Sequence, residues 1–460
     1  MKVIHTLCLP IVLWMFFSSC SKERLELKPN SSIVTLSTVE DLQHLLDNAQ
    51  VTNVTGALSQ LSSDEYFIVD DKAFDGLNRQ TQRNAYVWAP DLYEGEEEPS
   101  WNNLYTAVFY ANSVLDAMEA KDFDHSDREA ENNLKGSALF IRAYSFHDLV
   151  RSFAPVYNTS TAARDLGIPL RLSSGIDEIK PRASVDESYR QILADLSVAR
   201  GLLTNDTSPI YKNRPSLASV FALYARVYLD MGDYLLAGRY ADSCLMINHE
   251  LIDYNTIDIA SQYPFHDTGS EVIYFSEQIN AYTTGYTNRY QGTFGMDSLL
   301  VSLYASNDLR LPIFFERNSL GNYSIKRGYT RGLYAFTGLA WDEVLLIKAE
   351  CAARLRDVES AEQLLNELLQ KRYRRGTFTL PVFNNADELL TYVLTERRKE
   401  LVWRGLRWQD IKRLNREGRN IQLSRVIKGQ TYTLQPNDPR YVFPIPDNEI
   451  SLSGIEQNRR

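Results

Sequence analysis

The chain has 460 residues, a formal net charge of −10 and 44% apolar residues. This composition excludes a disordered or fibrous protein and allows several domains or one extended helical array around a large core. The cysteines Cys8, Cys20, Cys244 and Cys351 follow no disulfide or zinc-site spacing. The 27 tyrosines exceed what a core requires, which indicates a binding surface because tyrosine serves both packing and wet contacts.

Residues 1–19 have the features of a secretory signal. Lys2 is positive, and residues 7–17 form an uncharged apolar run that is too short for a permanent bilayer span. Cys20 directly follows Ser18 and Ser19, an arrangement that resembles a bacterial lipobox, in which the leader is removed and the new terminal cysteine is acylated, for example with palmitate. We therefore expect a lipidated tether over residues 20–37. The alternative is an ordinary cleaved signal with an incidental cysteine.

Helical periodicity begins in the mature chain at residues 38–47, returns at Trp101 and continues over about residues 127–153, where Pro155 should end it. Residues 60–100 mix acidic and aromatic residues without periodicity, and we interpret them as an irregular surface region. Their carboxylates form no Asp-x-Asp-x-Asp-Gly loop, so solvated charge is favoured over a cation site. We predict no metal and no cofactor.

Two later segments repeat each other. In both, two small residues lie 12 positions apart, and an aspartate occupies the turn between them; the positions are Ala225, Asp233 and Ala237 in one copy, and Ala349, Asp357 and Ala361 in the other. Small residues at such positions let two antiparallel helices approach closely, as in a tetratricopeptide hairpin. Lys348 departs from the apolar pattern of the second copy. We place helical repeats at about residues 101–153, 216–247 and 341–371.

Residues 251–340 separate these hairpins and are rich in glycine and aromatic residues. The run from Glu271 to Ser276 favours a short strand, whereas residues 278–295 read as a loop. Long ordered loops on a helical scaffold are usual places for function.

The C-terminal part, residues 385–460, begins with a predicted capping box at Asn385 and Glu388 and a helix to about Gly405. Residues 371–425 hold 14 Lys or Arg against 6 Asp or Glu. Such a block could bind nucleic acid or acidic lipid, or it could satisfy carboxylates elsewhere in an acidic protein. We favour internal pairing because no RNA-binding signature accompanies the charge.

Catalytic motifs are missing from the sequence. No nucleophile elbow, His-Glu-x-x-His helix, phosphate loop or dinucleotide fingerprint occurs, and none of the six histidines has metal-ligand spacing. A glycosidase needs only two carboxylates, which sequence alone leaves open. A helical repeat scaffold without a catalytic motif nevertheless favours binding over turnover.

The C-terminal part also contains a distinctive motif, whose residues include Arg397, Glu400, Trp403, Gly405, Arg407, Trp408 and Asp410. In these residues the C-terminal part resembles the SusD/RagB family of Bacteroidetes outer-membrane lipoproteins. Arg404 stands where the family usually has Glu, and Leu406 where it has His or Gln. Further matches are residues 139–144, residues 307–310 and the terminal segment 441–450, and the resemblance spans essentially the whole mature chain, residues 38–460, as one domain.

The resemblance implies a mostly α fold, in which tetratricopeptide-like hairpins form a superhelix and an irregular part, about residues 60–100 and 251–340, carries the ligand site. It also implies a surface-facing, lipid-anchored protein of the outer membrane that is not an enzyme. Such a protein would pass oligosaccharides to a SusC-like TonB-dependent transporter.

Sugar C–H faces pack on aromatic rings while hydroxyls bind amide and charged groups. On this basis the candidate ligand contacts are Arg79, Trp88, Tyr93, Tyr282, Tyr286 and Tyr290. Peptide capture and glycan degradation are the alternatives, and nucleic-acid binding is disfavoured by the export signal.

Overall fold

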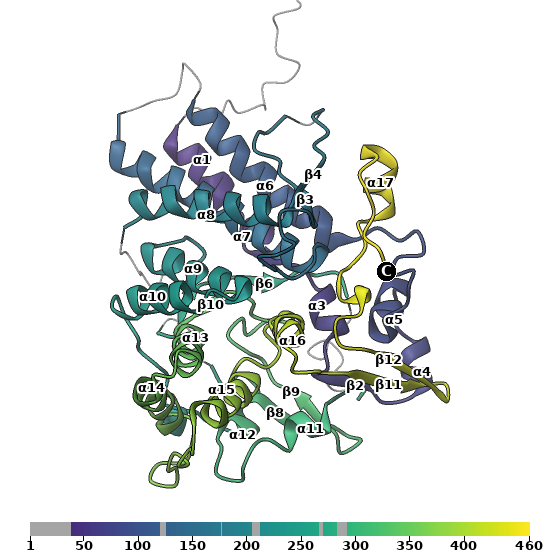
Figure 1. The fold of residues 1–460 in the computed structure, drawn as a ribbon, viewed down its shortest axis with the longest axis vertical. Helices are drawn as coiled ribbons and strands as arrows, with labels where there is room; N and C mark the ends of the chain where they lie inside the picture. The colour runs from purple at the N-terminus through teal and green to yellow at the C-terminus, as the bar shows by residue number, and fades with distance from the viewer. Residues whose placement is uncertain (1–37, 120–125, 176, 205–211, 266–269, 283–291) are drawn as a thin grey trace, which may run out of the picture.

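The computed structural model describes residues 38–119, 126–175, 177–204, 212–265, 270–282 and 292–460. Helices dominate these residues and stack side by side, with short strands and loops gathered beside them (Figure 1). The mostly α fold class is therefore confirmed. The longer helices are α1 (Val39–Leu46), α5 (Gln80–Val87), α6 (Pro99–Met118), α7 (Arg128–Phe153), α8 (Val185–Leu202), α9 (Leu217–Met231), α10 (Tyr234–Leu245), α13 (Trp341–Arg354), α14 (Val358–Gln370), α15 (Ala386–Glu400) and α16 (Arg407–Arg416). The shorter ones are α2 (Ala49–Thr52), α3 (Leu58–Ser62), α4 (Asp71–Asp75), α11 (Ser298–Val301), α12 (Arg310–Phe314), α17 (Asp447–Ser453) and the 3₁₀ turns η2 (Tyr254–Thr256) and η3 (Pro439–Tyr441).

Three pairs of neighbouring helices occupy the segments where repeats are predicted. α6 packs against α7, α9 against α10, and α13 against α14. α8 contacts both α7 and α9, and α10 contacts α13, so each pair touches the next. This arrangement buries one continuous core between stacked hairpins, as repeat proteins do.

The aspartate shared by the two repeats caps the second helix of each hairpin. The carboxylates of Asp233 and Asp357 accept hydrogen bonds from the backbone N–H three residues ahead, at 3.0 and 3.2 Å. These bonds satisfy N–H groups that the helix leaves unpaired at its start. Lys348, which breaks the apolar pattern, donates to Asp242 of the preceding hairpin at 2.6 Å. The two repeats are thus also linked by an ion pair.

α8 is not predicted from the sequence, although its first turn carries a recognisable signal. The Ser184 hydroxyl accepts from the N–H of Glu187, and the Glu187 carboxylate accepts from the N–H of Ser184 at 2.8 Å. This reciprocal pair is a capping box, which a search for Ser-x-x-Glu would find.

The strands of the described residues form two-stranded pairs that join distant segments. β1 and β6 are parallel, and the remaining pairs are antiparallel. β5 confirms the strand predicted at residues 271–276. The pairs are β1 (Val54–Thr55) with β6 (Glu277–Gln278), β2 (Tyr66–Ile68) with β7 (Phe294–Met296), β3 (Leu166–Pro169) with β4 (Arg182–Ser184), β5 (Val272–Tyr274) with β10 (Leu339–Ala340), β8 (Phe315–Arg317) with β9 (Tyr323–Ile325), and β11 (Leu423–Ile427) with β12 (Gln430–Leu434).

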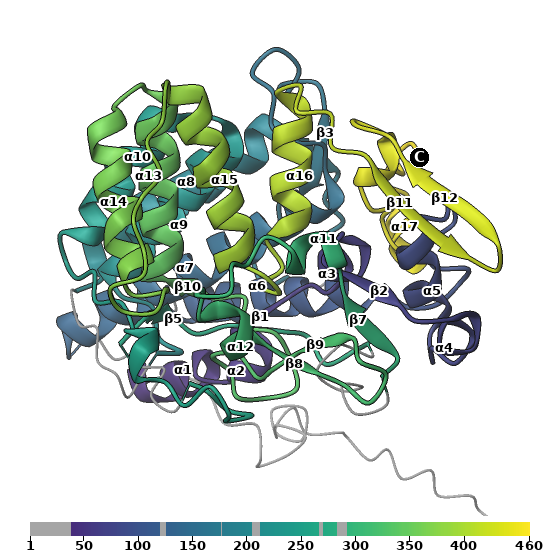
Figure 2. The same cartoon turned by 90° about the horizontal axis from the view of Figure 1, so that it is seen from below.

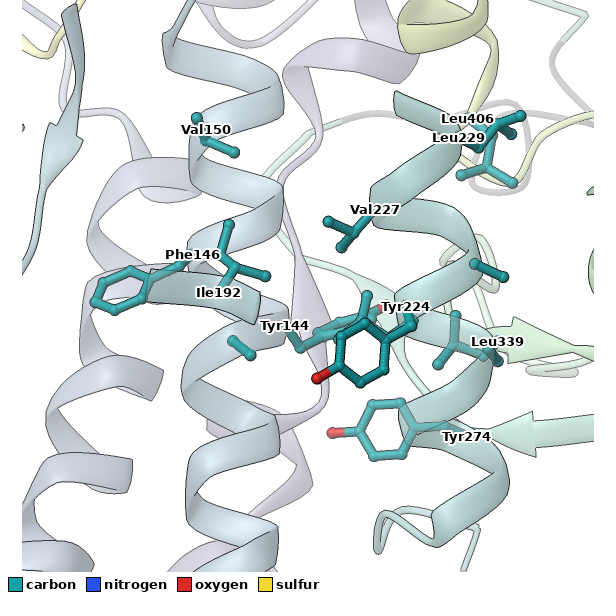
Figure 3. Packing of buried hydrophobic residues seen from close by; sticks show 14 of the residues in the cluster. Tyr144, Phe146, Val150, Ile192, Tyr224, Val227, Leu229, Tyr274, Leu339 and Leu406 are labelled. Atoms are coloured by element: carbon teal, nitrogen blue, oxygen red, sulfur yellow. The ribbon is translucent and has the colours of Figure 1, made fainter. Parts of the chain in front are cut away.

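The largest core joins the helices to this irregular part. Figure 3 shows Tyr144 from α7, Tyr224 from α9, Tyr274 from β5 and Leu339 from β10 in one packed cluster. The ring centroids of Tyr144 and Tyr274 lie 5.4 Å apart and nearly perpendicular, a favourable edge-to-face arrangement. The irregular part is therefore held rigidly against the helical stack.

Many aromatic residues outside the stacked helical hairpins are buried, which corrects the interpretation of residues 60–100 as a surface region. These rings are buried in two smaller hydrophobic cores. Short two-stranded sheets are not stable alone, and the buried apolar area holds the strands to the helical scaffold. The buried aromatics of these two cores are Tyr66, Phe74, Tyr86, Phe294, Tyr304, Phe315 and Trp403 in one, and Tyr254, Phe265, Tyr329 and Phe336 in the other. Most of this tyrosine excess serves packing.

The helix predicted from Asn385 begins there but ends at Glu400 instead of Gly405. Trp403 and Gly405 have φ angles of 62° and 68°, which a right-handed helix cannot contain. The Glu388 carboxylate accepts from the N–H of Asn384 at 2.8 Å, so the predicted reciprocal bond is displaced by one residue. α16 follows this turn and lies between α15 and the β11–β12 hairpin (Figure 2).

Along the described residues, no helix combines the length and the apolarity that crossing a bilayer would require.

Candidate ligand-binding surface

Arg79 lies at the start of α5 and is held by the acidic segment that follows this helix. Its Nε is 3.4 Å from the Glu96 carboxylate, and its Nη2 donates to the carbonyl of Glu97 at 2.5 Å. Glu96 also accepts from the N–H groups of Gln80 and Thr81 at 2.9 and 3.0 Å, so it caps α5. The Arg79 side chain is about a quarter exposed, so part of it remains in contact with solvent.

Tyr282 connects this helix start to the irregular part. The Arg79 guanidinium lies 5.0 Å from the centroid of the Tyr282 ring, a cation–π contact. The Tyr282 hydroxyl donates to Glu98 at 2.6 Å, and Glu98 itself accepts from the N–H of Ser100 at the start of α6. Burial raises the pKa of Glu98 even though these bonds oppose the rise. Tyr282 is 5% exposed, so it positions Arg79 and offers little ring surface.

Two polar side chains that the sequence analysis did not select lie on the segments around β6. Asn280 is exposed and follows β6 by two residues, and its Oδ1 accepts a hydrogen bond from the Tyr334 hydroxyl. Tyr334 is half-buried, and its carbonyl accepts from Thr330 at 2.7 Å. No spacing or motif marks Asn280 and Tyr334 in the sequence. We define the candidate surface as Arg79, Asn280, Tyr282 and Tyr334.

The structure does not support Trp88 and Tyr93 as ligand contacts. Trp88 is 2% exposed, and its indole Nε1 donates to the carbonyl of Ser62 at 3.0 Å. Tyr93 is 1% exposed, and its hydroxyl donates to the carbonyl of Pro444 at 2.6 Å. Both rings are covered because the C-terminal segment folds back over residues 60–100, and both act as packing residues.

Tyr286, Tyr290 and Cys20, the residue predicted to accept the lipid, lie outside the described residues.

The C-terminal signature carries the internal pairing that its charge pattern indicates. Glu400 accepts from Arg372 at 2.6 Å and from Arg310 at 3.0 Å, and all three side chains are inaccessible to solvent. Burial raises the pKa of Glu400, but Arg372 and Arg310 outweigh this and hold it below its usual range. Arg404, a departure from the usual motif, pairs with Asp342 at 2.6 Å.

The other signature residues fasten α16 in the same way. Asp410 pairs with Arg397 at 3.0 Å and with Arg413 at 2.8 Å, and these partners lower its pKa to about 2 against the effect of burial. Arg407 donates twice to Asp64, at 2.7 and 2.8 Å. Trp408 donates to the carbonyl of Tyr441 at 3.1 Å. These internal contacts hold α16 against the rest of the chain.

Glu271, Asp342 and Glu400 each place one carboxylate oxygen within 4.8 Å of the others. This spacing would suit a cation, but Arg372 donates to Glu271 and Glu400, and Arg404 donates to Asp342. The guanidinium groups supply the counter-charge, so we interpret the cluster as part of the ion-pair network.

Three large cavities, the largest of about 830 Å³ beside α8, have no lining residue in the candidate surface. One cavity of about 550 Å³ lies between the end of α7, α16 and the C-terminal tail. The side-chain amides of Asn415, Gln457 and Asn458, which line it, donate hydrogen bonds to backbone carbonyls of the chain itself. Another of about 590 Å³ lies beside α15. The candidate surface is therefore defined by its side chains and not by a cavity.

This fold, an array of helical hairpins with an irregular part packed against it, defines a class of helical repeat proteins. Two family models match the chain, one described as starch-binding and associating with the outer membrane over residues 23–229, and one described as the SusD family over residues 339–459. The two matches together identify the chain as a SusD/RagB-like protein.

Named relatives agree with this assignment. SusD-like protein P2 of Formosa agariphila is 24% identical over 438 residues, which cover 81% of each chain. A SusD superfamily protein of Bacteroides thetaiotaomicron has a TM-score of 0.73 at 22% identity, covering 92% of this chain and 100% of the other. A SusD-like carbohydrate binding protein of Bacteroides vulgatus has a TM-score of 0.67 at 18% identity, covering 91% and 96%.

Proposed function

We propose that the protein is a non-catalytic glycan-binding lipoprotein of the outer membrane that captures oligosaccharides at the cell surface and delivers them to a SusC-like TonB-dependent transporter. The family assignment carries this proposal. A model described as starch-binding matches residues 23–229, and a neighbour of the same fold is described as a carbohydrate binding protein.

The chemistry of the candidate surface fits a glycan. Arg79 and Asn280 offer nitrogen donors, and the half-buried Tyr334, which donates to Asn280, offers part of a ring. Sugar hydroxyls pair with such groups, and sugar C–H faces pack on rings. Because Glu96 and Tyr282 fix the Arg79 side chain, little rotamer entropy is lost when a sugar binds.

Substitution at the surface tests this placement. Arg79→Ala and Asn280→Ala should each weaken glycan binding about tenfold, which corresponds to one lost hydrogen bond to a charged or polar group. Arg190→Ala is a matched control, since Arg190 is a largely exposed arginine on the distant helix α8. Affinities would be measured by calorimetric titration, with thermal melting to verify folding. Unchanged affinity in both variants would exclude this surface.

A further inference from the structure

A groove that the proposed function does not use lies beside α15. It has a volume of about 590 Å³, and we call it the Arg398 groove. Aliphatic, polar and charged residues line it, and none of its lining residues is aromatic. The lining residues are Asp64, Asp297, Leu299, Leu303, Thr391, Leu394, Thr395, Arg398, Arg407, Leu414, Arg419, Ile421, Gln422, Leu423 and Ser424.

Arg398 is only loosely paired in this groove. Its Nη2 lies 3.2 Å from Asp64 and 3.7 Å from Asp297. Among the described residues its Nη1 makes no hydrogen bond, and its buried Nε has no partner. Asp64 is already held by both nitrogens of Arg407. The Arg398 side chain is 21% exposed, and its Nη1 therefore keeps donor capacity for an incoming acceptor, whereas Nε is buried.

The charges that line the groove favour an anion. Three arginines (398, 407 and 419) face two aspartates (64 and 297), so the lining has one excess positive charge. Burial and the neighbouring Arg407 both lower the pKa of Arg398. A bound anion would offset this unfavourable environment, because opposite charges attract more strongly where water is partly excluded.

The walls of the groove are aliphatic and partly uncovered. Leu299 is 71% exposed, and Leu303, Leu394 and Ile421 are half-buried. β11 runs along one side and pairs with β12 alone among the described strands, so its other edge has no strand partner. An unpaired strand edge can accept the backbone of an extended segment.

We propose that the Arg398 groove docks the C-terminal end of a partner protein. An extended segment brings a carboxylate to Arg398 at its terminus, an aliphatic last side chain to the leucines, and a backbone to the edge of β11. A glycan fits this groove less well, because sugar recognition usually uses aromatic rings and the lining has none.

Labelled peptides test this assignment. The probe is a mixture of fluorescein-labelled hexapeptides that end in leucine with a free carboxylate, with randomised preceding positions. The first control is the same mixture with an amidated terminus, and the second is an amidated mixture with glutamate before the leucine. The full mature chain should bind the free-acid mixture saturably, and both amidated mixtures at least about tenfold more weakly, as loss of a charge-assisted pair implies.

Variants connect the binding to the groove. Leu299→Glu adds a negative charge at an exposed position and should weaken free-acid binding at least about tenfold, and Arg398→Gln should do the same. Leu452→Glu is the matched control, since Leu452 is 79% exposed on α17, away from the groove, and it should leave binding unchanged.

Three outcomes would overturn the proposal: no binding of the free-acid mixture, equal binding of either amidated mixture, or unchanged binding in Leu299→Glu. Glycan binding at Arg79 is measured separately, so its success or failure leaves this test intact.

Discussion

Glu400, at the end of α15, shows at the residue scale how the C-terminal signature stabilises the fold. Its two oxygens accept from Arg372 and Arg310, which come from segments far apart in the sequence. Removing one member of a buried ion network leaves uncompensated charge, which typically costs about 3 to 5 kcal/mol. Glu400→Ala should therefore lower the free energy of unfolding by about that amount in urea titration. Glu359→Ala, at an exposed position of α14, should leave the midpoint unchanged. A normal midpoint for Glu400→Ala would contradict the structural role.

Glu65 is the residue for which we expect a pH effect. Burial raises its pKa from 4.5 to about 7, although Gln60 and the N–H of Trp403 donate to it. Between pH 4.5 and about 7, Glu65 of the folded protein keeps a proton that Glu65 of the unfolded chain has released. Its contribution to the free energy of unfolding is therefore full below pH 4.5 and falls as the pH rises to about 7. The fall is about 3 kcal/mol at most.

Glu65→Gln should abolish this fall. Urea titrations of both proteins at several pH values between 4.5 and 7 would give the difference in their free energies of unfolding. That difference should shift steadily in favour of the variant as the pH rises. A difference that stays constant with pH would show that Glu65 keeps an ordinary pKa.

At the scale of elements, the turn between α15 and α16 requires a backbone conformation with positive φ. Gly405 has a φ of 68°, and a Cβ there would lie 3.4 Å from Thr337. Gly405→Ala should cost about 1 kcal/mol, because the alanine must adopt a left-handed conformation. Gly201→Ala is the control, since Gly201 lies in the last turn of α8 with open space around it. Equal melting temperatures for Gly405→Ala and the wild type would contradict the strained turn.

Elements with local signals were predictable from sequence. Asn385 and Pro155 set the start of α15 and the end of α7, and the aspartates at 233 and 357 marked the helical hairpins. The end of α15 was not predictable from sequence. Trp403 has a positive φ, and tertiary contacts such as the hydrogen bond from its N–H to Glu65 stabilise this conformation. Burial of Trp88 and Tyr93 was not predictable for a similar reason, since residues that contact them lie about 350 residues further on.

For the whole molecule, the proposed lipid anchor at Cys20 gives a prediction of its own. Acyl chains contribute about 0.8 kcal/mol per buried CH₂, and two or more are needed for stable attachment. Cys20→Ala should therefore move the protein from the membrane fraction to the soluble fraction in cells that lack the transporter. Immunoblotting of the separated fractions measures this. A Cys20→Ala protein that stays in the membrane fraction would contradict lipid attachment at this residue.

Glycan capture without cleavage is the central claim, and one measurement tests it most directly. The purified mature chain is run through native gels that contain single polysaccharides, while reducing ends are assayed in parallel solutions. We predict saturable retardation by at least one polysaccharide and no new reducing ends. Retardation by none of them, together with saturable binding of peptides, would contradict the glycan assignment, and new reducing ends would contradict the non-catalytic role.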